Sequence, residues 1–219
     1  MPHRMTPAQA WSALVAGNDR FVRGEMEHPA QGVEDRTQLS VAQNPFAVVF
    51  GCSDSRVAAE IVFDRGLGDL FVVRTAGHVV DTTVLGSIEF GVEVLGAPLV
   101  VVLGHDSCGA VGAAANALAT GTLPSGFVRA VVDRVIPSIV HLPTDDDAAP
   151  GAGGASAPLA LTPEVLGREH VRHTVRMLQS YSAGLAAAVA EGRCAVVGVE
   201  YALAEGRARL VEHAGAIDV

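Results

Sequence analysis

The sequence predicts an α/β protein with a central, mostly parallel β-sheet of four parallel strands plus a C-terminal edge strand, flanked by helices. Short valine-rich runs bounded by glycine or proline are typical of strands buried on both faces of a parallel sheet. Stretches with helical periodicity separate these runs, as the crossovers of a parallel sheet require. The predicted strands are residues 46–50, 70–73, 99–103 and 195–199, followed by a short strand near Leu210.

The chain begins with a predicted amphipathic helix. Thr6 is a suitable N-cap, Pro7 suits the first helical position, and Gly24 is a typical stop. We refer to residues 1–40 as the N-terminal arm. The apolar side chains of this helix are Trp11, Leu14, Val15 and Phe21.

Further helices are predicted at residues 57–63, 81–95, 110–119, 126–140 and 163 to about 191. Residues 143–161 contain an acidic run and a tract of Gly, Ala, Ser and Pro. Such a segment cannot bury enough apolar surface to offset the entropy lost on ordering, so we expect a flexible insertion there. Because 219 residues suffice for one substantial core, residues 1–219 are expected to form a single domain.

The composition argues against several classes of function. A net charge of −9 leaves no basic face for a phosphate backbone, so no nucleic-acid partner is expected. No stretch approaches the roughly 20 apolar residues that span a bilayer, and no signal-peptide pattern is present. We therefore expect a cytoplasmic protein without a membrane partner. Three cysteines make no disulfide framework, and intracellular cysteines near a histidine more often indicate metal binding or catalysis.

Two polar fragments directly follow predicted strands, at residues 51–57 (GCSDSRV) and 104–109 (GHDSCG). The carboxyl ends of parallel strands form the crevice where ligands bind, so Cys52, His105 and Cys108 are expected to converge. His-x-x-Cys spacing lets two side chains of one turn hold the same ion. A third ligand from another strand leaves one tetrahedral position open, which is the pattern of catalytic zinc. The sequence thus predicts one Zn²⁺ per chain.

The remaining polar residues of these fragments allow more than one interpretation. Asp54 and Arg56 could form only a helix cap and a surface ion pair. Beside a thiolate-bound metal we favour a catalytic pair, in which Arg56 keeps Asp54 ionised and Asp54 orients a zinc-bound hydroxide. A lone buried cysteine is usually an inert apolar residue, and this is our interpretation of Cys194.

The spacing Cys-x-Asp-x-Arg, followed after about fifty residues by His-x-x-Cys, resembles the β-class carbonic anhydrases. The resemblance includes residues 71–77 (FVVRTAG) and 86–90 (GSIEF) and is strong over roughly residues 40–120. Residues 64–69 and 197–201 look most like the actinobacterial, mycobacterial-type branch. The resemblance implies a zinc-dependent lyase, carbonate dehydratase, that reversibly hydrates carbon dioxide to bicarbonate and a proton.

The resemblance also assigns a substrate pocket. Phe71, Ala76 and Phe90 would supply its apolar walls. Gln43 corresponds to a glutamine that donates a hydrogen bond to a substrate oxygen across a subunit interface in the family. Gly109 would offer its backbone N–H to the developing bicarbonate.

Three further expectations follow from the resemblance. In some members of the family the equivalent of Asp54 leaves the arginine and takes the fourth zinc position, which closes the site until the pH rises. His78 is the nearest candidate for a proton shuttle, although a helix-cap or surface role fits it as well. We also expect a homodimer or homotetramer with active sites near the dimer interface. The N-terminal helix would pack on a partner, because exposed Trp11, Leu14 and Phe21 make a poor monomer surface.

Three alternative functions stay open. Related enzymes hydrolyse carbon disulfide or carbonyl sulfide on the same zinc centre. Cys52 could instead be the nucleophile of a thiol-phosphate enzyme, but only three residues separate it from Arg56, where about five are needed to wrap a phosphate. A non-catalytic zinc module closed by Asp54 is the third alternative, and the presence of Arg56 argues against it.

Overall fold

The computed structural model describes residues 5–140 and 162–218 and contains one five-stranded sheet in the order β2-β1-β3-β4-β5. The strands are β1 (Ala47–Cys52), β2 (Leu70–Thr75), β3 (Leu99–His105), β4 (Ala195–Ala202) and β5 (Arg207–Ala214). The first four are parallel, and β5 pairs with β4 in the antiparallel direction at the edge. The predicted sheet, with four parallel strands and a C-terminal edge strand, is confirmed.

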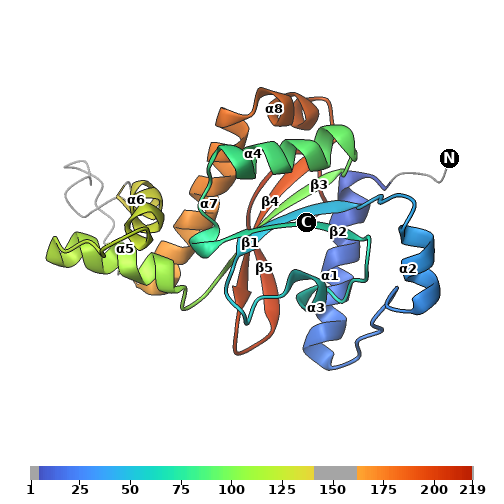
Figure 1. Ribbon diagram of the computed structural model, residues 1–219, viewed down its shortest axis with the longest axis horizontal. Coiled ribbons are helices and arrows are strands. Elements are labelled where there is room, and N and C mark those ends of the chain that lie inside the picture. The colour runs from blue at the N-terminus through green and yellow to red at the C-terminus, as the bar shows by residue number, and fades with distance from the viewer. Residues whose placement is uncertain (1–4, 141–161, 219) are drawn as a thin grey trace, which may run out of the picture.

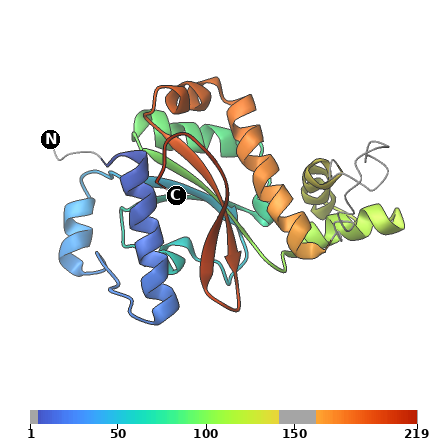
Figure 2. The same cartoon turned by 180° about the vertical axis from the view of Figure 1, so that it is seen from behind.

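Helices cover both faces of the sheet (Figures 1 and 2). They are α1 (Pro7–Arg23), α2 (Val33–Leu39), α3 (Ala59–Val62), α4 (Thr82–Glu89), α5 (Gly109–Thr120), α6 (Val128–Ile139), α7 (Pro163–Tyr181) and α8 (Ala183–Ala190), with a 3₁₀ turn η1 (Ala76–His78) and a π-helical segment η2 (Phe90–Val94). Helices α1 and α3 pack on one face, and α4, α7 and α8 pack on the other. Helices α5 and α6 extend beyond the sheet at the end where β3 leads into α5 (Figure 1).

The central strands are buried along their whole length because both of their faces are covered. Successive side chains of a strand point to opposite faces. Val101 accordingly lies in the core beneath α1, whereas Val100 and Val102 lie in the core beneath α4 and α7. This double burial explains why the strands read as continuous valine-rich runs.

The N-terminal helix packs on its own chain, which corrects the expectation that its apolar side chains are exposed. Trp11 is 6% exposed and Leu14 is fully buried in the core beneath α1, while Phe21 is partly buried against it. The buried side chain of Asn18 donates to the carbonyl oxygen of Val62, which ties α1 to α3. The predicted cap is confirmed, because the Thr6 hydroxyl accepts a hydrogen bond from the helix.

The long helix predicted from residue 163 to about 191 is wrong, because the structure breaks it at Ser182. The backbone of Ser182 is extended, and its hydroxyl accepts from the amide of Leu185 at 3.1 Å while donating to Glu89 at 2.6 Å. A capping hydroxyl competes with the helix for backbone hydrogen bonds, and here a tertiary contact with α4 favours the break. Gly184 also meets Glu93 closely, since a Cβ there would lie 1.8 Å from a Glu93 carboxylate oxygen.

Several smaller differences concern the connecting segments. Helix α2 was not predicted, because it is short and none of its residues is buried. The helix expected at 57–63 is only α3, and the helical pattern at 81–95 divides into α4 and η2. The predicted insertion at 143–161 lies outside the described residues. Within 5–140 and 162–218, no helix has the length and apolar character needed to cross a bilayer.

Candidate metal centre

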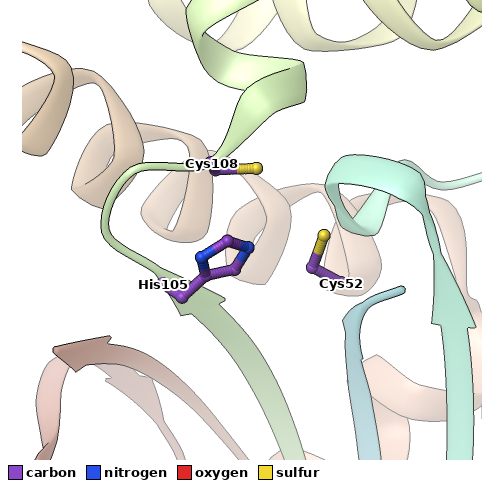
Figure 3. A group of neighbouring side chains, drawn as sticks. All are labelled: Cys52, His105 and Cys108. Atoms are coloured by element: carbon purple, nitrogen blue, oxygen red, sulfur yellow. The ribbon is translucent and has the colours of Figure 1, made fainter. Parts of the chain in front are cut away.

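Three predicted metal ligands meet at the carboxyl ends of two neighbouring strands. Cys52 ends β1 and His105 ends β3, and these strands are paired up to Gly51 and Leu103. Cys108 caps the N-terminus of α5. The ligand atoms of Cys52, His105 and Cys108 all lie within 4.8 Å of one another, and all three residues are buried. Figure 3 shows their side chains around a common space.

The imidazole of His105 is oriented so that one ring nitrogen is available to a metal. Nδ1 lies 2.7 Å from the carbonyl oxygen of Asp106, and because a carbonyl only accepts, Nδ1 carries the proton. The lone pair of Nε2 is then free. This atom is buried and has no hydrogen-bond partner among the described residues. A buried lone pair beside two sulfurs fits a zinc ion with a Cys₂His donor set.

The two sulfurs share one proton in the metal-free chain. A hydrogen bond from the Cys108 thiol lowers the pKa of Cys52 to about 4, against the opposing effect of burial. The same bond, together with burial, raises the pKa of Cys108. Burial lowers the pKa of His105, but the adjacent Cys52 thiolate outweighs burial and raises that pKa overall. Cys52 is therefore a thiolate at neutral pH and ready to bind a metal.

Asp54 and Arg56 form a bidentate ion pair beside the three ligands. The Arg56 side chain donates from Nε to Asp54 Oδ1 at 2.9 Å and from Nη2 to Oδ2 at 2.8 Å. These hydrogen bonds hold the pKa of Asp54 far below its usual range. Asp54 Oδ2 also lies 3.8 Å from Nε2 of His105, so the carboxylate borders the space between the ligands.

The turn between His105 and Cys108 explains how two ligands of one segment face the same point. Ser107 has a φ of +51°, a left-handed conformation that turns the chain sharply. The amide of Asp106 donates to the carbonyl of Tyr201 at 3.1 Å, which fixes the turn to β4. The ligand geometry is thus set by backbone contacts as well as by sequence spacing.

A family model described as carbonic anhydrase matches residues 47–208, which is well over half of the chain. The chain belongs to this carbonic anhydrase family. Its relatives include "Carbonic anhydrase" of Mycolicibacterium smegmatis, 54% identical over 96% of both chains. "Carbonic anhydrase 2" of Mycobacterium tuberculosis is 53% identical, also over 96% of both chains.

Solved β-carbonic anhydrases have the same fold as this chain. The β-carbonic anhydrase CafA of Aspergillus fumigatus is 25% identical, with a TM-score of 0.65 over 92% of this chain and 90% of that one. A β-carbonic anhydrase of Coccomyxa has the same fold, with a TM-score of 0.64 over 82% and 78% of the chains at 24% identity. The protein is therefore a β-class carbonic anhydrase of the mycobacterial type.

Two of the predicted pocket residues lie at the metal-ligand end of the sheet of this carbonic anhydrase. Ala76 directly follows Thr75, which pairs with Cys52 across β1 and β2, and it is exposed. Gly109 is the first residue of α5, next to Cys108, and is also exposed. Both can border a small molecule that reaches the ligands.

Three other pocket residues lie away from the ligands of their own chain. Phe71 pairs with Val48, four residues before Cys52, which places it about 13 Å along the strand at 3.3 Å per residue. Phe90 packs beside it, with ring centroids 6.0 Å apart. Gln43 is exposed in the segment that precedes β1. A single chain therefore does not bring Gln43, Phe71 and Phe90 to the metal ligands.

His78 lies inside the protein, which corrects its interpretation as a proton shuttle or as a cap or surface residue. It is 2% exposed, and neither ring nitrogen has a hydrogen-bond partner among the described residues. Burial, with smaller contributions from His170 and His105, holds its pKa well below the usual value. A shuttle must exchange protons with solvent near neutral pH, and a buried neutral imidazole cannot do so.

Gly77 and Arg74 contact this centre, and neither contact was predicted from sequence. The Gly77 amide donates to the sulfur of Cys52 at 3.3 Å, and Arg74 donates to the carbonyl oxygens of Cys52 and Asp54. The glycine at the end of the motif at 71–77 was the available sequence signal for the first contact, since the turn there requires a φ of +63°. Cys194 is buried at the start of β4 and burial raises its pKa to about 12, in keeping with an inert residue.

Proposed function

We propose that the protein catalyses the reversible hydration of carbon dioxide to bicarbonate and a proton. One zinc ion per chain would be held by Cys52, His105 and Cys108. When bound, zinc supplies a Lewis acid that makes a water molecule reactive near neutral pH. The observation that carries the proposal is the buried Nε2 of His105, which has no partner among the described residues and lies within 4.8 Å of two cysteine sulfurs.

Asp54 would orient the attacking oxygen by accepting its hydrogen bond. Arg56 donates two hydrogen bonds to Oδ1 and one to Oδ2, and because a carboxylate has about four acceptor positions, one position on Oδ2 stays free. Because Arg56 holds the pKa of Asp54 far below neutral, this carboxylate is too weak a base to remove a proton. Its role is therefore to fix a direction, while Ala76 and the Gly109 amide border the space in which carbon dioxide is attacked.

Two thiolates and one imidazole bring the charge of a zinc core to zero, whereas three imidazoles would leave it at +2. A neutral core should lower the pKa of a bound water less than a core of charge +2 does. Activity should therefore rise toward alkaline pH. Competition of Asp54 for the fourth zinc position would steepen the same trend. An activity that is flat from pH 6.5 to pH 9 would contradict this part of the proposal.

The test is stopped-flow carbon dioxide hydration on purified protein whose zinc content is measured. We expect about one zinc per chain, and Cys108→Ser should lose both metal and activity. Cys194→Ser is the matched control, because it removes a buried cysteine outside the centre and should keep both. Full zinc without turnover at any pH would reject the anhydrase function and favour hydrolysis of carbon disulfide or carbonyl sulfide.

We further propose a homo-oligomer in which Gln43, Phe71 and Phe90 complete the site of a neighbouring chain. Gln43 is exposed and Phe90 is 43% exposed, so both are free to contact a partner. A structural relative from Sordaria macrospora with the same fold is described as tetrameric, with a TM-score of 0.66 over 94% of this chain and 98% of that one at 20% identity.

Mixing two inactive variants tests this arrangement. Gln43→Ala keeps its metal ligands, and Cys108→Ser keeps Gln43. If Gln43 acts across the interface, co-refolded mixtures should regain activity, because mixed oligomers contain one complete site. If Gln43 acts within its own chain, mixing would restore nothing.

A further inference from the structure

Gly77 lies between a metal ligand and a buried histidine on another helix. Its amide donates to Cys52 Sγ at 3.3 Å, and its carbonyl oxygen lies 2.8 Å from Nε2 of His170 on α7. A φ of +63° and close contact with α5, where a Cβ would lie 2.6 Å from Cβ of Ala110, leave little room for any other residue. The backbone at Gly77 is therefore held from both sides.

The hydrogen bonds of His170 define its protonation state. The Gly77 carbonyl can only accept, so Nε2 of His170 carries a proton. Nδ1 lies 2.7 Å from the hydroxyl oxygen of Ser138 on α6. That oxygen also lies 2.6 Å from the carbonyl oxygen of Val135 in the same helix, and its single proton can go to only one of the two. Burial lowers the pKa of His170 to about 4, in keeping with a neutral imidazole. The Gly77 carbonyl thereby selects the tautomer, and a neutral ring of that tautomer accepts the Ser138 proton at Nδ1.

We infer that His170 is a positioning residue of the metal centre: its Nε2–H holds the Gly77 carbonyl so that the Gly77 amide stays aimed at the Cys52 sulfur. This inference rests on the proposed zinc site. An N–H group that bonds a thiolate stabilises its charge and restricts where the sulfur can move. His170 thus acts on a zinc ligand from α7 without touching it.

His170 is held by hydrogen bonds as well as by core packing. His170 is 1% exposed and both of its ring nitrogens are bonded to other segments, one to η1 and one to α6. The hydroxyl of Thr174, one turn further along α7, donates to the carbonyl oxygen of His170 at 2.8 Å. The imidazole therefore joins α6, α7 and η1 at the point where η1 contacts the ligand.

Two substitutions separate hydrogen bonding from packing. His170→Gln places an amide donor near the position of Nε2, whereas His170→Met fills similar space without a donor. Leu178→Ala is the matched control, because it removes a fully buried side chain from the same helix, in the core beneath α4 and α7 and outside the Gly77 contact. A purely structural role would make His170→Met and Leu178→Ala behave alike at equal loss of stability.

The readouts are zinc affinity by competition with a chelator, the sulfur-to-cobalt charge-transfer absorption of the Co²⁺-loaded protein, and the chemical shift of the Gly77 amide proton. His170→Met should weaken zinc binding about tenfold and change both spectra. Loss of a group that supports a metal ligand through hydrogen bonds has effects of this size. The zinc affinity and the spectra of His170→Gln should be closer to those of the wild type than to those of His170→Met. Leu178→Ala should keep the wild-type affinity and cobalt spectrum.

Wild-type affinity and spectra in His170→Met would overturn the inference, and so would equal impairment of His170→Gln and His170→Met. If His170→Met does not fold, Ser138→Ala provides the decision. It removes the hydroxyl that bonds Nδ1 and holds the ring against α6, so the Gly77 amide proton should shift and zinc affinity should fall. An unchanged Gly77 signal would overturn the inference. Absence of zinc binding by the wild type itself would instead reject the proposed function.

Discussion

Arg74 donates a hydrogen bond from Nε to the carbonyl oxygen of Cys52 at 2.9 Å. The same guanidinium donates from Nη2 to the carbonyl oxygen of Asp54 at 2.6 Å. A planar fork that binds two carbonyls of one loop fixes the spacing between the residues that carry them. Arg74 on β2 thus sets the position of a metal ligand relative to the carboxylate that borders the site.

Removal of this fork is expected to impair activity more than metal binding. In Arg74→Ala, Cys52 remains anchored in β1, but the loop to Asp54 loses its support. We expect kcat to fall by about tenfold or more with nearly full zinc content. Stopped-flow hydration and metal analysis check this. Arg193→Ala, which removes only an exposed ion pair with Glu191, is the control and should match the wild type. Equal activity of the two variants would contradict the role of Arg74.

The Asp54–Arg56 pair gives a second prediction. Arg56→Lys keeps the positive charge but loses the two parallel hydrogen bonds, so the Asp54 carboxylate is no longer held in one direction. We expect kcat to fall by about tenfold and zinc content to stay unchanged. The pKa of Asp54, followed by NMR of labelled carboxyl carbons, should move up toward its ordinary range in Arg56→Ala. A variant with a full rate would show that the pair is only a surface ion pair.

Burial of His170 predicts that stability falls in mild acid. Its folded pKa is lowered from 6.5 to about 4, so the unfolded chain binds a proton first as the pH falls. The stability contribution is present above pH 6.5 and is lost between pH 6.5 and pH 4. From pH 7 to pH 5 the loss from this residue is about 2 kcal/mol.

Urea unfolding of the metal-free protein at the two pH values measures this effect. Chelator is present throughout, so that metal release does not contribute. His78 adds a loss of the same sign, so the comparison is between the wild type and His170→Gln. The variant should show the smaller difference between pH 7 and pH 5. An equal difference in both proteins would mean that His170 is not a buried neutral group.

The packing of α1 on its own chain predicts a large effect of a core substitution there. Leu14 is fully buried, so Leu14→Ala should lower the free energy of unfolding by about 3 kcal/mol. Its neighbour Val15 is 40% exposed, and Val15→Ala should change stability by less than about 0.5 kcal/mol. Chemical unfolding of both variants checks the pair. A small effect of Leu14→Ala would mean that this helix face is covered only by a partner chain.

Much of the fold could be predicted from sequence because its signals are local. Strands buried on both faces read as continuous apolar runs, and their ends coincide with the polar fragments that hold Cys52, His105 and Cys108. Parallel strands bring their carboxyl ends to one edge, so ligands far apart in the chain could be expected to meet. Asp54 and Arg56 are close in sequence, and their pairing follows from that spacing.

The tertiary structure alone decided what depends on distant contacts. His170 lies 93 residues after Gly77, and no motif in the sequence predicts their hydrogen bond. The same holds for Ser182, where a contact with Glu89 on α4 favours a cap over a continuous helix. His78 was predicted as a proton shuttle, or else as a cap or surface residue, because its place near the ligands in sequence does not reveal that it is buried. Sequence therefore determined the strands and the metal ligands, whereas packing between helices decided which residues support those ligands from behind.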